Sequence, residues 1–587
     1  MRKDSTWRFT MLGTIFSLLA VLIVVQLVRI QLNPEQVSHF LGQSDLYAGE
    51  WRTIKPTRGL IYDRQGHLLA GNTTVYEVGV ELARVQNPHT IALTLNVVLG
   101  LDYSKVYDAV TTEASSEVAT VVLDDFVPQE YIDRLEQFKQ DINQTYTGGR
   151  GKEPPSLSGL VYQPHLQRSY PEKDMGSNVL GFVSREGVGY FGVEAKYQDL
   201  LEGAAQTVWI PLDPNRAEDL PEISDGASIV LTLDRAIQAE MEDVIDRAVA
   251  FNGADSGTIV VIEPKTGDIL AMATTPRLNL NEYWRYSEVF QGSTPFNRIV
   301  SQAYEPGSVY KVLTMATALD SGAVTPETTF IDTGVFEIGG AYIYNWNSGA
   351  WGPQDMQGCM QHSLNVCLAW IASEVGPKDF YDYMRAFGIG HLTGVDLAGE
   401  VPGRLKVPGD SDWYDADLGT NAFGQGVSAT PLQMAMAISA IANDGKMMAP
   451  RIVRSMVDDG QQFNTEPRVV GRPISNKTAN ILSEMLAVSL EEEASDALIE
   501  GYRFAGKTGT AEIPTPYGYS ISATNASFVG WGPVDDPRFL AYIWLEKPTS
   551  SPWGSVVAAP VFRQVVERLV VLMDIPPDRV RQALITQ

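Results

Sequence analysis

The chain has 587 residues, which is too long for one ordinary domain core and predicts roughly three to five modules. Hydrophobic residues make up 44% of it and charged residues only 20%, and this composition excludes a mainly disordered chain. The balance of 44 Lys and Arg against 71 Asp and Glu gives a net charge of −27, which would repel a phosphate backbone, so nucleic acid is excluded as a partner.

The first predicted element is a membrane span near the amino terminus. Residues 9–28 carry no charge, and twenty helical residues cross roughly the 30 Å core of a bilayer. A cleaved signal peptide is the alternative, but the run ends in bulky residues where a signal peptidase needs small ones. Arg2, Lys3 and Arg8 precede the span and only Arg29 follows it closely, so we expect a cytoplasmic amino terminus and an extracytoplasmic body.

Strand and helix patterns alternate over the next part of the chain. Residues 58–70 predict a strand, a turn supplied by Gly66 and a second strand. Residues 193–201 predict a helix that ends at Gly203. The Pro- and Asp-rich stretch 211–226 is typical of a boundary between domains.

The second half predicts a sheet whose strands come from both ends of a domain, with helices inserted between them. The expected strands are 229–234, 258–263, 268–273, 527–531 and 539–545. The expected helices run to about residue 249, follow Ser308, follow Thr430-Pro431 and cover 561–573.

The first chemical motif is Ser308-Val309-Tyr310-Lys311, which follows Pro306-Gly307 and opens a long apolar helix. A serine in the first turn of a helix lies where unpaired backbone N–H groups favour a developing negative charge. Ser308 and Lys311 are three residues apart and share one helical face, where a lysine of lowered pKa can remove the serine proton. Most Ser-x-x-Lys sequences are solvated helix faces, so this motif alone indicates little.

Two more motifs lie downstream of the first. Ser363-Leu364-Asn365 is the only Ser-x-Asn in the chain, and its alternative interpretation is a polar turn at a helix start. Lys507-Thr508-Gly509-Thr510 predicts a strand whose glycine lets a substrate backbone approach, with a hairpin turn as the alternative. The same tripeptide at 265–267 lies between Pro264 and Asp268 and joins two apolar strands, so there a turn is favoured.

The order of the three motifs carries a resemblance to a known family. Ser363 follows Ser308 by 55 residues and Lys507 follows Ser363 by 144, which is the triple signature of penicilloyl-serine transferases. Over nearly its whole length the chain resembles the class B penicillin-binding proteins. Further segments that carry the resemblance are 58–70, 168–171, 192–194, 423–426, 527–530 and 557–562.

The resemblance implies a multidomain fold of the α+β or α/β class. It comprises a single N-terminal transmembrane helix, a mixed α/β pedestal and a transpeptidase domain, which is similar to serine β-lactamases and has a central antiparallel sheet flanked by helices. The expected divisions are a cytoplasmic tail (1–8), an anchor (9–30), a pedestal of the dimerisation type (31–222) and a penicillin-binding domain (223–587).

The resemblance also implies roles for the first two motifs. Ser308 attacks the carbonyl of the penultimate D-alanine in a stem peptide ending in D-Ala-D-Ala, which releases the terminal D-alanine and leaves an acyl-enzyme. Lys311 is the base for that step. Ser363 relays a proton to the leaving amine, and Asn365 binds the peptide amide and orients Lys311.

The third motif is implied to bind the substrate. Lys507 and Thr508, followed by Gly509, hold the terminal carboxylate, and the backbone N–H groups of Ser308 and Thr510 form the oxyanion hole. An amine of a neighbouring stem peptide then takes the acyl group. β-Lactams act as covalent inhibitors because they mimic the D-Ala-D-Ala end.

No cofactor and no metal is expected. The histidines lie in no triad motif and no H-E-x-x-H occurs, which argues against a Ser-His-Asp hydrolase and a zinc peptidase. Asp355, Cys359 and His362 crowd before Ser363, where ordinary packing is favoured over a metal site. On one helix Cys359 and Cys367 would be about 12 Å apart along the axis and beyond disulfide reach, although a loop around Cys359 would change that.

The sequence therefore predicts a single-pass, penicillin-sensitive peptidoglycan D,D-transpeptidase of the cytoplasmic membrane, which acts in cell-wall synthesis during division or elongation. The resemblance implies a multi-spanning glycan polymerase as membrane partner. A β-lactam-binding receptor and a catalytically silent scaffold are the rivals, and the receptor would need a cytoplasmic signalling module. The acidic run 491–493 predicts a solvated loop or helix end, which argues against a β-lactamase.

Overall fold

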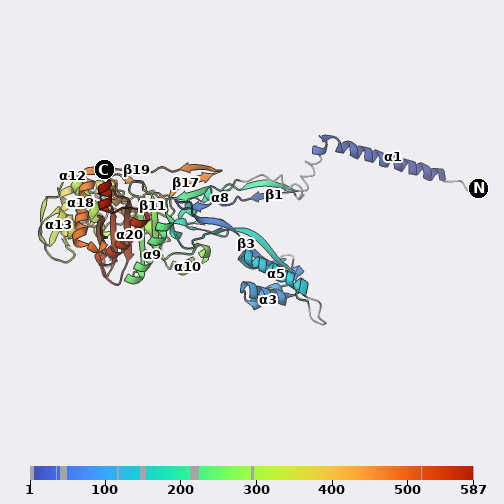
Figure 1. Ribbon diagram of the computed structural model, residues 1–587, viewed down its shortest axis with the longest axis horizontal. Coiled ribbons are helices and arrows are strands. Elements are labelled where there is room, and N and C mark those ends of the chain that lie inside the picture. The colour runs from blue at the N-terminus through green and yellow to red at the C-terminus, as the bar shows by residue number, and fades with distance from the viewer. Residues whose placement is uncertain are drawn as a thin grey trace, which may run out of the picture. The chain divides into compact units, whose positions relative to one another are not determined.

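The structure of the chain is a computed structural model, which describes residues 6–34, 36–39, 49–115, 118–145, 154–211, 224–292, 296–516 and 518–585 (Figure 1). Its contacts divide the chain into two compact units. The first comprises Met1–Pro56 and Gly203–Asp225, and the second comprises Thr57–Glu202 and Gly226–Gln587. All three chemical motifs lie in the second unit.

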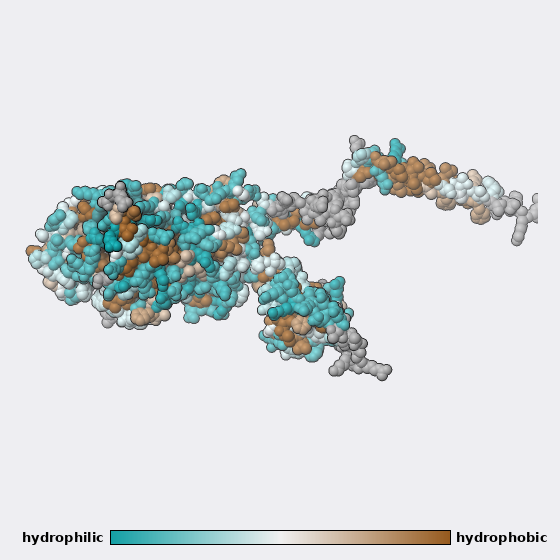
Figure 2. Space-filling view, viewed as in Figure 1, coloured by the Kyte–Doolittle hydropathy of each residue, from teal (hydrophilic) through white to brown (hydrophobic). Residues whose placement is uncertain are grey.

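The first unit contains the predicted membrane span. Helix α1 (Thr6–Gln31) begins before the uncharged run 9–28 and ends after it. Among the residues that the structure describes, it is the one helix long and apolar enough to cross a membrane, and Figure 2 shows hydrophobic residues along it. Arg2 and Lys3 of the predicted orientation signal lie outside the described residues. Strands β1 (Gly49–Ile54) and β8 (Gln206–Pro211) pair antiparallel in the same unit.

The strand, turn and strand predicted over 58–70 are confirmed in the second unit. Strands β2 (Ile61–Tyr62) and β3 (Leu68–Glu81) pair antiparallel, and Gly66 turns between them at a φ of 91°, a value that favours glycine. Strand β3 also pairs with β4 and β5. These strands and three helices enclose a small apolar core: β4 (Thr120–Pro128), β5 (Leu160–Ser169), α3 (Pro88–Leu99), α4 (Tyr103–Val110) and α5 (Gln129–Thr145).

The single helix predicted over 193–201 is wrong. The structure has two short helices in its place, α7 (Gly192–Lys196) and α8 (Gln198–Glu202). Tyr197 separates them because its backbone leaves the helical region, at φ −112° and ψ 28°, and its hydroxyl donates a hydrogen bond to Asp396 at 3.3 Å. A tertiary contact therefore overrides the local helical pattern.

A buried ion cluster joins the three segments that resemble pedestal motifs. Glu194 is fully buried, and its carboxylate accepts hydrogen bonds from Arg58 Nε at 2.8 Å and from Arg168 Nε at 2.7 Å. A buried carboxylate is tolerated only when such partners compensate for its lost hydration. The cluster therefore holds together segments that are far apart in sequence.

The predicted domain boundary at 222/223 lies outside the described residues and stays a prediction. Strands from both sides of it share one seven-stranded sheet, in which β2 pairs in parallel with β9 (Ser228–Leu231). The order is β18-β17-β9-β2-β3-β4 with β5 beside β3. The two strands at the β18 edge are β17 (Val453–Asp458) and β18 (Gln461–Asn464).

A five-stranded antiparallel sheet forms the centre of the second half. Its strands come from both ends of the domain, as predicted, in the order β11-β10-β22-β21-β20. Their bounds are Ile269–Thr275 for β11, Ser256–Ile262 for β10, Phe539–Glu546 for β22, Gly518–Gly532 for β21 and Ala505–Thr515 for β20.

Helices cover both faces of this sheet. On one face α9 (Arg235–Asn252) and α20 (Ala559–Leu572) pack over residues such as Ile259 and Val261 of β10. The intervening residues of the same strand belong to the other core, because successive strand residues point to opposite faces. The expected architecture, a central antiparallel sheet flanked by helices, is confirmed.

The second core contains the helices that carry the site. They are α12 (Lys311–Ser321), α13 (Met356–Gln361), α14 (Asn365–Val375), α17 (Pro431–Ala442) and α18 (Asn476–Glu493). Helix α17 starts as predicted at Thr430, whose side chain accepts a hydrogen bond from the N–H of Gln433, with proline at the first helical position. Every residue of α17 is buried, so this helix lies in the middle of the core.

Shorter elements connect these larger ones. The helices are α6 (Ser177–Leu180), α10 (Tyr286–Val289), α11 (Arg298–Ser301), α15 (Pro377–Ala386), α16 (Asp415–Asn421), α19 (Gly554–Val557) and α21 (Asp578–Ile585). The strands are β6 (Phe182–Val183), β7 (Gly189–Tyr190), β12 (Thr329–Asp332), β13 (Val335–Ile338), β14 (Ala341–Tyr344), β15 (Gly352–Asp355), β16 (Met447–Met448) and β19 (Val469–Gly471).

Candidate active site

Ser308 lies on a tight turn that precedes the predicted helix. Residues Gly307–Tyr310 form a 3₁₀ turn, and α12 begins at Lys311. With three residues per turn, side chains at i and i+3 are eclipsed, so Ser308 and Lys311 share one face more closely than on an α-helix. Gly307 has a φ of 61°, and a Cβ there would lie 2.6 Å from the carbonyl oxygen of Thr510. The glycine therefore lets the Ser308 turn pack directly against strand β20.

Lys311 is buried behind Ser308 and contacts the second motif. Its side chain is completely inaccessible, and Nζ donates hydrogen bonds to Ser363 O at 2.7 Å, Ser363 Oγ at 3.1 Å and Asn365 Oδ1 at 2.7 Å. Burial, and then the positive charge of Lys507, hold the pKa of Lys311 well below its usual range. The environment thus favours the neutral amine more than water does.

Ser363 lies in the turn between α13 and α14, and Asn365 is the first residue of α14. The backbone of Ser363 has a φ of 53°, which is uncommon for a residue other than glycine. Asn345 supports this turn, because its Oδ1 accepts a hydrogen bond from the N–H of Val366 at 3.2 Å. The helix start is confirmed, and the chemical role of Ser363 and Asn365 stays a prediction.

A disulfide bond encloses this turn. Cys359 and Cys367 do not share one helix, the arrangement that would have kept them apart; they belong to two helices, α13 and α14, and the Ser363 turn between them brings them within disulfide reach. Their Cα atoms are 6.0 Å apart and the sulfur atoms are bonded. Cys359 therefore has no thiolate to offer to a metal. Asp355 caps α13 by accepting a hydrogen bond from the N–H of Gly358 at 2.8 Å.

Lys507 lies on β20, the last strand in the order of the central sheet. It is only 5% exposed, and Nζ has long hydrogen bonds, to Thr508 Oγ1 at 3.4 Å and to Thr508 O at 3.5 Å. Burial lowers the pKa of Lys507 to about 8, against the opposing charge of Glu493. A buried cation with weak partners is suited to receiving an anionic group.

Gly509 plays a different part from the one expected. A Cβ at this position would overlap the hydroxyl of Ser527 and would lie 2.9 Å from Val309 Cγ1. Protein atoms, rather than an open approach for substrate, thus occupy the space beside the glycine. Its absent side chain lets β20 pack against Val309, the neighbour of Ser308.

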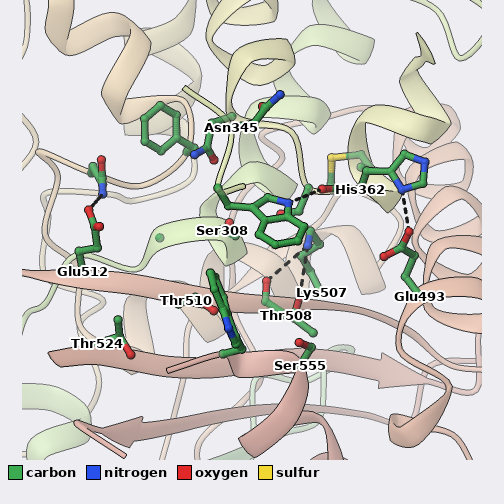
Figure 3. A pocket seen from close by; sticks show the side chains of 18 of the residues that line it. Ser308, Asn345, His362, Glu493, Lys507, Thr508, Thr510, Glu512, Thr524 and Ser555 are labelled. Carbon is green, nitrogen blue, oxygen red and sulfur yellow. Dashed lines mark hydrogen bonds and ion pairs between the residues drawn. The ribbon is translucent and has the colours of Figure 1, made fainter. Parts of the chain in front are cut away.

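One cavity of about 890 Å³ brings the motifs together. Of the eight residues that the sequence predicts, those that line it are Ser308, Ser363, Asn365, Lys507, Thr508 and Thr510. Lys311 lies buried behind this lining and Gly509 packs inside the strand. Figure 3 shows Ser308, Lys507 and Thr508 around the same space, with Glu512 to one side and the His362–Glu493 pair to the other.

Sequence reasoning missed several residues that line the cavity. Glu493 is the last residue of α18, so the helix end predicted for the acidic run is confirmed, but its carboxylate also accepts a hydrogen bond from His362 Nδ1 at 2.6 Å. Two tryptophans, Trp346 and Trp553, line the cavity as well. No local pattern marks these residues, because their partners are distant in sequence.

Two family models match the chain. The model of the penicillin binding protein transpeptidase domain matches residues 257–567, and the model of the penicillin-binding protein dimerisation domain matches residues 53–216. The first match contains all three chemical motifs, and the second contains Arg58, Arg168 and Glu194 of the buried ion cluster.

Curated proteins and solved structures agree with these models. Stage V sporulation protein D of Bacillus subtilis is 31% identical over 544 residues, which cover 90% of this chain and 80% of that protein. Peptidoglycan D,D-transpeptidase FtsI of Escherichia coli is 26% identical over 595 residues, which cover 98% of this chain and 93% of that protein. The structure of penicillin binding protein 3 from Mycobacterium tuberculosis, complexed with aztreonam, matches with a TM-score of 0.68 at 25% identity, over 90% of this chain and 98% of that one.

The fold and the relatives do not favour the two alternative functions, a catalytically silent scaffold and a β-lactam-binding receptor. The apolar helix α1 fits a single-pass membrane protein, and the transpeptidase domain supports binding of stem peptides and β-lactams. The chain belongs to the class B penicillin-binding proteins and is a serine-type peptidoglycan D,D-transpeptidase of cell-wall synthesis.

Proposed function

We propose that Ser308 is the nucleophile of this transpeptidase. Its hydroxyl oxygen attacks the carbonyl of the penultimate D-alanine, an ester bond forms, and the peptide bond to the terminal D-alanine breaks. The observation that carries the proposal is the hydrogen bonding of Lys311, which joins the first motif to the second through Ser363 and Asn365 behind the cavity that Ser308 lines.

Lys311 and Ser363 move the proton. In its neutral form Lys311 keeps two N–H groups, which suffice for Ser363 O and Asn365 Oδ1, and its lone pair takes the proton of Ser308 as the ester forms. Its lowered pKa supports this role. Ser363 Oγ, 3.1 Å from Lys311 Nζ, passes a proton to the departing amine. Asn365 holds the amine of Lys311 in place through its Oδ1 and binds the peptide amide of the substrate.

Strand β20 binds the end of the stem peptide. The ammonium of Lys507 and the hydroxyl of Thr508 receive the terminal carboxylate, because a buried cation gains more from an anionic partner than an exposed one. The backbone N–H groups of Ser308 and Thr510 stabilise the oxyanion, and the packing of Gly307 against Thr510 brings the two backbones together. A β-lactam with the same carboxylate acylates Ser308 in the same way.

The second half of the reaction uses an amine of a neighbouring stem peptide. The amine attacks the ester carbonyl, an amide cross-link forms, and Ser308 regains its proton through Lys311. Among the described residues we assign no carboxylate to activation of water, since Glu493 is paired with His362.

We propose that the catalytic part of the chain lies outside the cytoplasm. We place residues 1–8 in the cytoplasm, 9–30 in the membrane, and the pedestal (31–222) and transpeptidase domain (223–587) outside. The disulfide between Cys359 and Cys367 supports this orientation, because disulfides persist in oxidising compartments. A multi-spanning glycan polymerase is the membrane partner that we propose, in division or elongation.

Covalent labelling of the full-length protein with a fluorescent penicillin tests the assignment. Wild type is expected to be labelled and Ser308→Ala to lose all labelling. Ser321→Ala, at the exposed end of α12, the helix that follows the Ser308 turn, is the matched control and is expected to label like wild type. An unlabelled wild type, or a labelled Ser308→Ala, would overturn the assignment.

A further inference from the structure

Two tryptophans meet across the cavity that contains Ser308. The ring centroids of Trp346 and Trp553 are 5.5 Å apart at an interplanar angle of 71°, an edge-to-face contact. Both side chains line the cavity, and they are 52% and 41% exposed. Single exposed apolar side chains are common on protein surfaces, whereas two tryptophans in contact at one cavity form an apolar patch of the kind that marks a functional surface.

Trp346 is fixed to the wall that carries the second motif. It follows strand β14, and its indole Nε1 donates a hydrogen bond at 3.2 Å to the backbone oxygen of His362, the residue before Ser363. Its neighbour Asn345 is buried and holds the N–H of Val366 on α14. Trp346 therefore moves with the Ser363 turn.

Trp553 is fixed to the opposite wall, which carries the third motif. It immediately precedes α19, whose first residue, Gly554, donates its N–H to Thr510 Oγ1 at 3.0 Å. A Cβ on Gly554 would overlap the carbonyl oxygen of Gly509, so the start of α19 lies directly on β20. The contact between the two tryptophans, the aromatic bridge, thus connects both walls of the cavity.

Water and the acceptor amine compete for the acyl-enzyme, and the aromatic bridge lies where it can affect this competition. The ester on Ser308 has two competing fates: an amine breaks it to form an amide, or water breaks it to form a free acid, and in each case Ser308 recovers its proton. Water is always present in large excess over the amine. A cross-linking enzyme therefore needs to keep bulk water from the ester while it waits for its second substrate.

We propose that Trp346 and Trp553 act as an apolar cover that limits the access of water to the acyl-enzyme and so sets the ratio of cross-linking to hydrolysis. This inference rests on the proposed role of Ser308. The two indoles present apolar rings where the surrounding lining is rich in hydroxyl, amide and charged groups. Their separate attachments let the bridge open when the walls part for an incoming amine and close again after it leaves.

The partition of an acyl-enzyme tests the cover directly. The full-length protein is given an N-acyl-D-alanyl thioester as donor and D-alanine as acceptor amine, and the acid and the amide products are quantified separately. Trp346→Ala and Trp553→Ala are each expected to raise the ratio of acid to amide by about fivefold or more, because more water reaches the ester. Trp346→Phe is expected to stay near wild type.

Two comparisons make the outcome specific. The double variant is expected to match either single variant, since one missing indole already opens the bridge, whereas independent roles would multiply the two effects. Trp284→Ala is the matched control, because Trp284 is 57% exposed and lies outside the cavity lining.

Fluorescent penicillin separates the two possible failures. A tryptophan variant that is labelled at Ser308 with an unchanged product ratio would overturn the cover and leave the proposed function intact. A wild type without labelling would overturn both. Labelled variants that release the penicilloyl group faster than wild type would support the cover by a second readout.

Discussion

The tripeptide Lys-Thr-Gly occurs twice in this chain, and the two copies have different surroundings. At 265–267 it forms the turn between β10 and β11, where Gly267 has a φ of 78° and Thr266 Oγ1 donates to Glu263 at 2.8 Å. Lys265 is 51% exposed on its side chain and pairs with Asp536. Each residue of this copy serves the turn or the surface.

The copy at 507–509 lies within β20 instead. Lys507 is 5% exposed, its pKa is lowered to about 8, and Thr508 beside it lines the cavity. The same three residues thus form a surface turn in one place and part of a buried strand beside the cavity in the other. Burial and the facing wall, rather than the tripeptide itself, decide the chemistry.

Replacing the lysine of each Lys-Thr-Gly copy by alanine is expected to give the largest difference in acylation rate between the two copies. We expect Lys507→Ala to lower kcat/KM for acylation by about 100-fold, because a charge-assisted hydrogen bond to the substrate carboxylate is lost. Lys265→Ala is the matched variant and is expected to acylate within about twofold of wild type, since exposed ion pairs contribute little. Acylation rates with a β-lactam measure both. Equal losses in the two variants would remove the distinction between the copies.

Replacing the glycine of each copy by alanine is expected to affect different properties: acylation at Gly509 and stability at Gly267. Gly509→Ala pushes a methyl group toward Val309 beside Ser308, so we expect acylation to fall by about tenfold or more. Gly267→Ala is strained by its positive φ and by the carbonyl of Ala449, so we expect a loss of about 1 to 3 kcal/mol in unfolding free energy with normal acylation by the folded protein. Denaturation and acylation measured on each variant would sharpen the contrast, and a Gly267→Ala variant that folds stably but acylates slowly would break it.

The Ser363 turn, on the side of the cavity opposite β20, is held by the disulfide between Cys359 and Cys367. Replacing Cys359 and Cys367 by alanine opens a short loop around Ser363, and we expect about 2 to 3 kcal/mol lower unfolding free energy and several-fold slower acylation. Chemical denaturation and acylation rates are compared with the untreated and the chemically reduced wild type. Full activity and stability without the disulfide would show that Ser363 and Asn365 keep their positions unaided.

The pH dependence tests Lys507 without replacing it. Lys507 must be protonated to bind a carboxylate, and its pKa is about 8, so kcat/KM for acylation is expected to be near half its plateau at pH 8 and about tenfold lower at pH 9. Lys311 must be unprotonated, so its lowered pKa places the loss of activity on the acidic side. In Lys507→Arg the alkaline fall is expected to disappear, because a guanidinium keeps its proton. An alkaline fall retained in that variant would assign it to another group.

Local patterns predicted the parts of the fold that local physics decides. The anchor, the Gly66 turn, the start at Thr430 and the turn at 265–267 follow from charge, glycine geometry and capping within a few residues. The order of Ser308, Ser363 and Lys507 indicated the family, and the structure brings these three residues to one cavity.

Long-range contacts explain the rest. Tyr197 breaks a helix through Asp396, and His362 contacts Glu493 at a separation of 131 residues. The disulfide depends on a turn between two helices that an eight-residue spacing does not reveal. None of these contacts leaves a period or a motif in the sequence.

Peptide mapping of the acylated protein tests the central claim most directly. The full-length protein is incubated with a β-lactam and digested, and mass spectrometry locates the penicilloyl group. The account predicts one modified position, Ser308, with modification lost in Ser308→Ala. A penicilloyl group on Ser363 or on any other residue of the wild-type protein, or its absence from every peptide, would contradict the account.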